Sequence, residues 1–260
     1  MSTDTSHYAN WRGIDYRPAL PKIPLNSLAP YLCKGQTVLE IGCNSGRTAL
    51  WLESLGLNVL GADINADAIL QARASAKVLN AGTRFREGDF LDQTDRGKFD
   101  LVVMVRVLTC FSQLADWRAL LARSHECVAP GDLIFVHDFL FTPENDSYRE
   151  RYKEGARQGW RTGNFAVPGK DRGLLFIAHH HSEEELSEIM NPYEKLFLNM
   201  HDSLSLNGNA CLMFEFLGKR KAVAYMPDGQ FLRTPFLDDF RVADHPGTDQ
   251  FKSTLCLFPG

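Results

Sequence analysis

The sequence predicts an α/β fold in which a seven-stranded, mostly parallel sheet with an antiparallel edge strand is flanked by helices. Three observations support this prediction. The β-branched and apolar run Thr37–Ile41 is followed at once by a glycine turn. Apolar residues then recur at helical spacing from Arg47, and Gly56 stands where a left-handed cap would end a helix. A second apolar run, 58–62, closes on Asp63. This succession is typical of a nucleotide-binding βαβ unit.

The glycine turn distinguishes between two kinds of ligand. Gly42, Asn44 and Arg47 occupy the three positions of a G-x-G-x-x-G fingerprint. A dinucleotide pyrophosphate must lie against backbone at these positions, and here it would meet side chains at two of them. The turn therefore disfavours a nicotinamide oxidoreductase and favours a ligand without phosphates, with an amino acid at one end and a ribose at the other.

Residues 40–46, EIGCNSG, resemble motif I of the class I S-adenosylmethionine-dependent methyltransferases, with Asn44 in place of the usual middle glycine. The resemblance implies that the turn backbone passes the methionine part of the cofactor and that Asp63 receives both ribose hydroxyls. The resemblance is to the members of this family that act on small molecules. The expected cofactor-binding residues are Glu40, Gly42, Cys43, Asn44, Gly46, Asp63, Ile64, Asp89, Phe90 and Arg106.

Three later stretches match the same family in register. Asp89 and Phe90 follow a third strand at 84–87, where the family places an acidic residue against the adenine amino group and an apolar residue over the ring. Residues 99–105 resemble the fourth strand, and 128–136 resemble the proline-glycine turn and the fifth strand. The matching elements thus extend the resemblance over residues 37–138.

The remaining elements complete a single domain over residues 1–260. Asn65 is the expected N-cap of a helix over 66–79, and Ser182 and Glu185 form the capping box of a helix ending near 190. The other expected parts are a short helix at 21–32, a helix at 116–128, and an antiparallel strand pair at 194–201 and 210–217. An N-terminal lid at 1–32, an inserted cap at 142–181 and a C-terminal extension at 218–260 with a hairpin are also expected.

Titratable residues follow the fourth and fifth strands, at the sheet edge where open α/β folds bind ligands. Arg106 needs an anionic partner if it is buried. That partner is either a carboxylate of the cofactor or substrate, or the side chain of Glu40 or Asp63. His137 and Asp138 end the fifth strand and are expected catalytic residues, with His137, beside Asp138, as the proton acceptor or orienting group. The main rival is His181. A metal site is not expected at 179–181, because three adjacent histidines cannot all face one ion in a regular element.

The expected cap carries seven Lys or Arg between residues 149 and 172, against three acidic residues. Such an excess suits an anionic acceptor, although paired charges on a helix could equally be a solvated surface. In the N-terminal segment, aromatic residues either contact the ligand or fasten the segment to the domain. The expected substrate residues are Tyr8, Trp11, Arg157, Trp160 and Arg161.

Composition narrows the functional class further. The net charge is −4, whereas nucleic-acid-binding proteins usually carry an excess of basic residues. No apolar run approaches the roughly 18 residues that a membrane span needs. Six cysteines without a C-x-x-C pair, and no leader, predict a soluble, cytoplasmic chain with reduced thiols. Monomer and homodimer both remain open.

The sequence therefore predicts a methyltransferase that uses S-adenosylmethionine and acts on a small, anionic or partly aromatic metabolite. Whether nitrogen, oxygen or carbon accepts the methyl group is open. The alternatives are a methyltransferase that acts on RNA or protein and a non-catalytic S-adenosylmethionine-binding protein.

Overall fold

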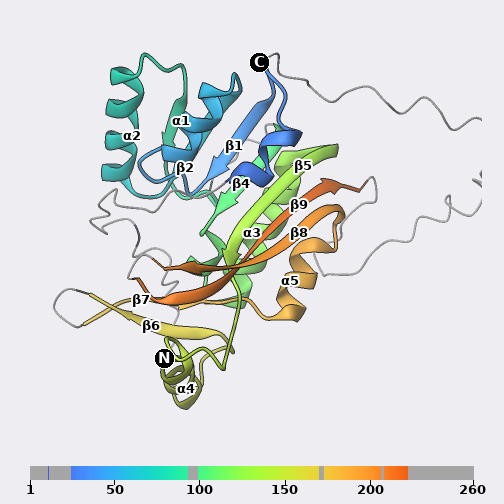
Figure 1. The fold of residues 1–260 in the computed structure, drawn as a ribbon. Helices are drawn as coiled ribbons and strands as arrows, with labels where there is room; N and C mark the ends of the chain where they lie inside the picture. The colour runs from blue at the N-terminus through green and yellow to red at the C-terminus, as the bar shows by residue number, and fades with distance from the viewer. Residues whose placement is uncertain (1–10, 12–24, 93–98, 170–172, 206–207, 222–260) are drawn as a thin grey trace, which may run out of the picture.

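A seven-stranded sheet forms the centre of the molecule (Figure 1). The computed structural model describes residues 11, 25–92, 99–169, 173–205 and 208–221. The strand order is β3-β2-β1-β4-β5-β9-β8. The strands are β1 (Thr37–Ile41), β2 (Asn58–Asp63), β3 (Arg84–Glu87), β4 (Phe99–Val105), β5 (Val128–Phe139), β8 (Tyr193–Leu204) and β9 (Ala210–Arg220).

Strands β3, β2, β1, β4 and β5 are parallel, so their carboxyl ends meet at one edge. Strand β9 runs antiparallel to both β5 and β8 and lies one position in from the edge strand β8. The predicted fold class is confirmed. Successive strands are added on one side of β1 up to β3 and on its other side from β4 onwards, and this reversal of strand order creates the switch point where ligands bind in open α/β sheets.

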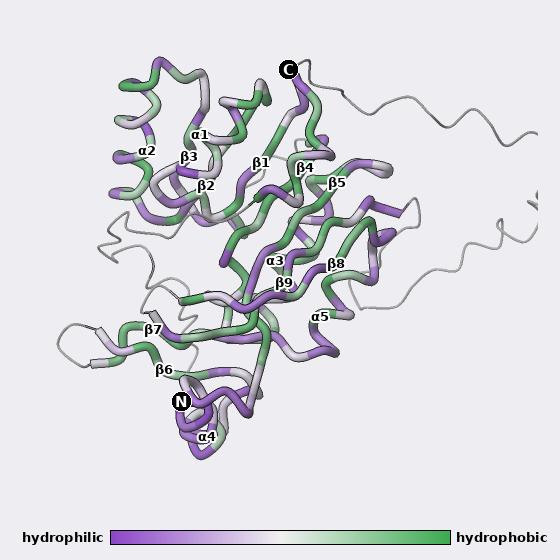
Figure 2. The backbone as a smooth tube through the Cα atoms, viewed as in Figure 1, coloured by the Kyte–Doolittle hydropathy of each residue, from purple (hydrophilic) through white to green (hydrophobic). Residues whose placement is uncertain are grey.

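Helices cover both faces of the sheet and bury a hydrophobic cluster on each. Figure 2 shows that β4 and β5, at the centre of the sheet, consist largely of hydrophobic residues. One face packs against α1 (Arg47–Ser54), α2 (Ala66–Val78) and the short turns η2 (Leu25–Ser27) and η3 (Ala29–Tyr31). The other packs against α3 (Leu114–Cys127) and α5 (Glu183–Met190). Burial on both faces explains why the central parallel strands β1 and β4 read as nearly continuous apolar runs instead of alternating ones.

Local signals set the helix boundaries. Asn65 caps α2 by accepting a hydrogen bond from the Ala68 amide at 2.9 Å. Ser182 and Glu185 form a reciprocal capping box at the start of α5. Each cap satisfies amides that the first helical turn leaves without partners, so the sequence pattern was sufficient to locate them.

The segment expected as an inserted cap folds into α4 (Arg149–Arg157) and a separate antiparallel pair, β6 (Asn164–Pro168) and β7 (Leu174–His179). This small layer has its own hydrophobic cluster, which includes Tyr148, Tyr152 and Phe165 and joins the main sheet through Phe139 and Met213. Figure 1 shows it beyond the carboxyl ends of the parallel strands. The two strands of this layer were not anticipated from the sequence.

Several expectations lie outside the described residues. These are most of the N-terminal lid, the hairpin expected after residue 221 and the rest of the C-terminal extension. The short helix expected at 21–32 is described only from Leu25 and consists of the two 3₁₀ turns η2 and η3. Among the residues that the structure describes, no helix is both long enough and apolar enough to cross a membrane.

Candidate active site

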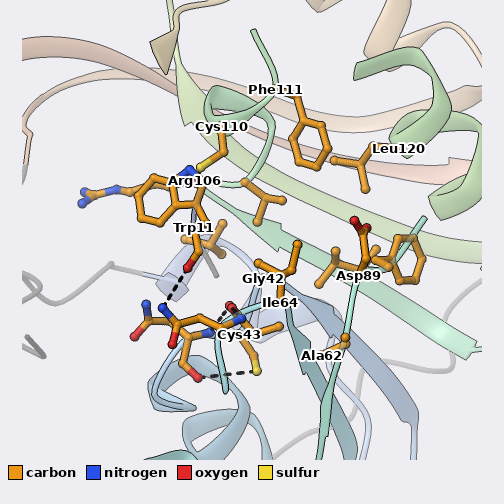
Figure 3. A pocket seen from close by; sticks show the side chains of 18 residues that line it. Trp11, Gly42, Cys43, Ala62, Ile64, Asp89, Arg106, Cys110, Phe111 and Leu120 are labelled. Atoms are coloured by element: carbon orange, nitrogen blue, oxygen red, sulfur yellow. Dashed lines mark hydrogen bonds between the residues drawn. The ribbon is translucent and has the colours of Figure 1, made fainter. Parts of the chain in front are cut away.

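A pocket opens at the carboxyl edge of the parallel strands, where β1, β2 and β4 end (Figure 3). Its wall combines the glycine turn after β1, the end of β2, the loop after β3 and the loop after β4. Apolar atoms dominate the wall, and a few polar groups converge on it, as is common in ligand sites. The lining residues are Trp11, Ile41, Gly42, Cys43, Asn44, Ala62, Asp63, Ile64, Asn65, Gly88, Asp89, Phe90, Val105, Arg106, Val107, Cys110, Phe111 and Leu120.

The turn after β1 adopts left-handed backbone at Gly42, with φ 70°, and at Asn44, with φ 48°. Asparagine tolerates this conformation better than other residues with a Cβ. Its side-chain oxygen accepts a hydrogen bond from the Ser45 amide at 2.6 Å, so the side chain folds back on its own turn. A Cβ at Gly42 would lie 2.6 Å from Val107 Cγ2. The replacement of the middle glycine is therefore compatible with the turn, whereas Gly42 is sterically required.

Asp63 ends β2 and presents its carboxylate at the pocket wall. Oδ2 accepts a hydrogen bond from the Asn44 amide and Oδ1 accepts one from the Asn65 amide, both at 2.8 Å. Burial raises the pKa of Asp63, and these backbone hydrogen bonds oppose that shift. Two amides from different loops thus fix the orientation of the carboxylate, and each oxygen keeps a lone pair for a further donor.

The loop after β3 forms another part of the pocket wall. Asp89 and Phe90 lie in the loop after β3, and Ile64 and Leu120 extend the apolar surface beside them (Figure 3). Asp89 Oδ1 accepts a hydrogen bond from the Leu91 amide at 3.0 Å. An acidic group beside an apolar slot suits a planar heterocycle with an exocyclic amine, because the ring is desolvated while the amine keeps an acceptor.

The loop after β4 completes the wall. Arg106 has left-handed backbone, φ 57°, and its amide donates to the His137 carbonyl oxygen at 2.8 Å. Its guanidinium lies 5.6 Å from the centroid of the Phe139 ring. Figure 3 shows this side chain leaving the pocket on the side opposite Asp89. The structure does not favour pairing with Glu40 or Asp63, since both carboxylates have other partners.

Sequence reasoning singled out only Arg106 in this loop, although Val107, Cys110 and Phe111 also line the pocket. Their position directly after the fourth strand could have predicted that they line the pocket. No sequence feature could have predicted this for Leu120, because α3 reaches the pocket only through tertiary packing. Burial raises the pKa of the Cys43 and Cys110 thiols well above their ordinary value, so neither offers a thiolate to a ligand near neutral pH.

Two expected cofactor residues lie behind the pocket wall. Glu40 is 3% exposed and its carboxylate accepts hydrogen bonds from the Thr48 hydroxyl and the Ala49 amide in the first turn of α1. Gly46 has φ 81°, and a Cβ there would lie 2.6 Å from Phe85 Cζ. Glu40 and Gly46 therefore support the turn after β1 without lining the pocket.

None of the three expected catalytic residues lines the pocket. Burial, reinforced by the charge of Arg106, lowers the pKa of His137 to about 3. His137 is 1% exposed, which does not favour a base that reaches the acceptor. Asp138 is fully buried, and its Oδ2 accepts a hydrogen bond from the Thr109 amide at 3.2 Å. Asp138 therefore supports the loop that follows β4.

His181 has a structural environment as well. Its Nδ1 donates to the Phe139 carbonyl oxygen and its Nε2 accepts from Trp117 Nε1, both at 3.0 Å. The neighbouring rings are also engaged, His179 with Asn164 and Glu185, and His180 with Tyr152. With both ring nitrogens occupied and no exposed surface, His181 has no free lone pair for a substrate proton.

Of the expected substrate residues that the structure describes, Trp11 alone lines the pocket. Its carbonyl oxygen accepts a hydrogen bond from Asn65 Nδ2 at 2.8 Å, and its ring lies 4.6 Å from that of Phe176 on β7. Tyr8 lies outside the described residues. The others are away from the lining: Trp160 follows α4, Arg157 pairs with Glu154 on the surface, and Arg161 pairs with Glu185. This arrangement favours the solvated-surface interpretation for Arg157.

The fold and this site together define a class of protein. Residues 38–131 match the family described as "Methyltransferase domain", and this stretch contains the glycine turn, Asp63 and Asp89. Residues 38–131 are therefore similar to a methyltransferase domain, and the chain has the fold of the class I S-adenosylmethionine-dependent methyltransferases.

Individual relatives share only part of their length with the chain. A ribosomal protein L11 methyltransferase from Thermus thermophilus is 36% identical over 111 residues, 42% of this chain and 41% of the relative. A ubiquinone biosynthesis O-methyltransferase from Glaesserella parasuis is 38% identical over 80 residues, 28% of this chain and 34% of the relative. The chain thus spans about two fifths or less of the length of these relatives.

Two solved structures extend the similarity over most of the fold. An S-adenosylmethionine-dependent methyltransferase from Methanosarcina mazei has a TM-score of 0.71 at 24% identity, covering 78% of this chain and 99% of that one. A magnesium protoporphyrin IX methyltransferase from Synechocystis, with bound S-adenosylhomocysteine, has a TM-score of 0.55 at 19% identity, covering 75% of this chain and 78% of that one. At these identities the likeness concerns the fold.

Proposed function

We propose that the protein is an S-adenosylmethionine-dependent methyltransferase whose acceptor is a small molecule. The observation that carries this proposal is the Asp63 carboxylate, which two backbone amides orient at the wall of a mainly apolar pocket. A carboxylate in this setting can accept two hydroxyl protons from a ribose. Among the described residues, the pocket lining offers no cluster of cations for a phosphate chain.

The residues present fit S-adenosylmethionine in three places. The open turn at Gly42 and Asn44 leaves backbone accessible to an amino-acid end, Asp63 suits the ribose, and Asp89 with Phe90 suits an aminopurine. The cofactor supplies an activated methyl group on a positively charged sulfur. The chain's own contribution is to bind both reactants, exclude water and hold the acceptor atom in line with that methyl group.

This mechanism requires little proton chemistry from the chain. A displacement at an activated methyl carbon needs a base only when the acceptor is protonated at the working pH. No histidine among the described residues lines the pocket, and burial holds the pKa of His137 and of His181 near 3. We therefore assign catalysis to positioning, which can contribute about 7 to 11 kcal/mol of a barrier.

The acceptor is proposed to be small and anionic or partly aromatic. Trp11 belongs to the pocket wall and is held there through Asn65, which leaves less room for a macromolecule than an open groove would. Trp11 and Phe111 bring aromatic surface to the pocket wall, whereas the guanidinium of Arg106 points out of the pocket and lies over the Phe139 ring. The names of the relatives include both a ribosomal protein and a ubiquinone-pathway methyltransferase, so this substrate class rests on the pocket.

Incubation with methyl-labelled S-adenosylmethionine and a fractionated cell extract tests the proposal directly. We expect label in a metabolite of low molecular mass, and we expect it to disappear with Asp63→Ala. Label in protein or RNA would replace the acceptor class with a macromolecule. No labelled product, together with intact S-adenosylhomocysteine binding, would reassign the chain as a non-catalytic cofactor-binding protein.

A further inference from the structure

His137 is buried in a way that its role in the fold does not explain. Its side chain is 1% exposed, and neither ring nitrogen has a hydrogen-bond partner among the described residues. A neutral imidazole carries one donor and one acceptor, and each destabilises the fold when it is buried without a partner. A bound ligand or ion would supply the partner that these buried nitrogens lack.

Two potential ligands lie beside it on neighbouring strands. Glu215 on β9 is paired directly with His137 on β5, so both side chains project from the same face of the sheet. His201 on β8 lies one strand further, with its ring 5.5 Å from that of His137 and almost parallel to it. One ligand atom from each of the three residues lies within 4.8 Å of the others.

The surroundings orient these atoms towards one another. His201 Nδ1 lies 3.3 Å from the Asp202 carbonyl oxygen, so it carries the proton and leaves the lone pair on Nε2, which is 3.8 Å from Glu215 Oε1. The Ser27 hydroxyl donates to the other oxygen, Glu215 Oε2, at 2.6 Å. Metal-binding histidines and carboxylates in proteins are commonly held in this way by a carbonyl or hydroxyl behind them.

The set of donors is selective for a class of ion. Two neutral imidazoles and one carboxylate suit Zn²⁺ and related divalent transition metals, whereas Mg²⁺ and Ca²⁺ prefer oxygen ligands. Glu215 supplies the negative charge that a bound cation requires at this site. Three protein ligands leave at least one coordination position for water or another molecule.

We propose that His137, His201 and Glu215 form a binding site for a divalent transition-metal ion of the zinc type. The site lies next to the pocket, because His137 is paired with Val105 at the end of β4 and Val105 lines the pocket. It was not visible in the sequence, where only the adjacent histidines 179–181 suggested a metal. The inference does not depend on methyl transfer.

Metal binding by the tag-free full-length chain tests this site. After treatment with a chelator, Zn²⁺ is titrated against a competing chromophoric chelator, and Co²⁺ absorption reports the ligand set. We expect His201→Ala and Glu215→Gln each to weaken Zn²⁺ binding by at least about tenfold and to change the Co²⁺ spectrum. The matched control is Asp202→Asn, an exposed acidic residue next to His201 whose side chain points the other way; it should leave both unchanged.

Thermal unfolding separates loss of the site from loss of the fold. His201 keeps about a third of its side chain exposed, so His201→Ala should unfold near the wild-type temperature without metal. Zn²⁺ should then raise the unfolding temperature of the wild type and not that of the variant. Zn²⁺ affinity within about threefold of wild type in His201→Ala, or no Zn²⁺ bound by the wild type, would overturn the proposal. Metal held elsewhere by thiols would give the first of these results.

Discussion

At the scale of single residues, the pocket depends on a few side chains that face both the ligand and the backbone. Asp63 is the clearest case, because its two oxygens join the turn after β1 to the start of α2 and remain open towards the pocket. The same atoms thus serve the fold and the proposed ribose contact. A substitution there must be read with two measurements, one of binding and one of stability.

Asp63→Ala should weaken S-adenosylhomocysteine binding by at least about tenfold, because a hydrogen bond to a charged group is worth about 1.5 to 3 kcal/mol. Isothermal calorimetry measures this loss. The control is Asp67→Ala, which changes an exposed carboxylate in the first turn of α2 and should affect only helix stability, by about 0.3 to 1 kcal/mol. Equal affinities for the Asp63→Ala variant and the wild type would remove Asp63 from the cofactor site.

Glu40 makes the stability of the protein depend on pH. Burial raises the pKa of Glu40 to about 8 in the folded chain, whereas an exposed glutamate titrates near about 4.3. Between these values the folded state holds a proton that the unfolded state has released. The free energy of unfolding therefore falls as the pH rises through this window, and the contribution is complete only below about pH 4.

Glu40→Gln should remove this fall while keeping an acceptor for the Ala49 amide. Unfolding temperatures of wild type and variant, measured at about pH 5, 7 and 9, should diverge in favour of the variant as the pH increases. Glu87→Gln, an exposed change on β3, is the matched control and should show no such divergence. Parallel curves for Glu40→Gln and wild type would mean that Glu40 titrates normally in the folded chain.

At the scale of elements, the arginines after β5 separate into two groups. Arg157, on α4, pairs with Glu154 and has 63% of its side chain exposed. Arg161 has 16% of its side chain exposed, pairs with Glu185 in the capping box of α5 and lies 5.0 Å from the centroid of the Trp117 ring. Arg161 thus connects the small layer to α3 and α5, while Arg157 belongs to a solvated helix face.

Arg161→Ala should lower stability by about 2 kcal/mol, or roughly 4 to 8 °C in unfolding temperature, because it leaves a mostly buried Glu185 with fewer compensating charges. Arg157→Ala should change stability by less than about 0.5 kcal/mol, since exposed pairs contribute little. Thermal denaturation of the two variants provides the comparison. If Arg161→Ala instead kept its unfolding temperature and raised the KM for the acceptor, the cap would hold the substrate, as the sequence had suggested.

At the scale of the whole molecule, cofactor binding should stabilise the entire domain, because the pocket joins β1, β2 and β4 with α2 and α3. At about 100 times its Kd, S-adenosylhomocysteine should add about 2.7 kcal/mol, which corresponds to roughly 5 to 11 °C in unfolding temperature. A nicotinamide dinucleotide should produce no shift. A shift with the dinucleotide alone would revive the oxidoreductase that the turn disfavoured.

The parallel half of the fold and the glycine turn after β1 could both be predicted from the amino-acid sequence. Strands β1 to β5, helices α1 and α2, and the caps at Asn65 and Ser182 follow from hydrophobic period and from hydrogen bonds within a few residues. Such signals are local, so they survive without knowledge of the rest of the chain. The family motif then added the expected roles of Asp63 and Asp89.

Which side chains lie close together could be seen only in the folded structure. His137 and His181 looked equivalent as titratable residues near a sheet edge, yet one lacks hydrogen-bond partners among the described residues and the other has both nitrogens engaged. Likewise, His137, His201 and Glu215 come together through strand register across β5, β9 and β8. Burial, pKa and metal geometry depend on contacts between residues far apart in the chain, and no local pattern encodes them.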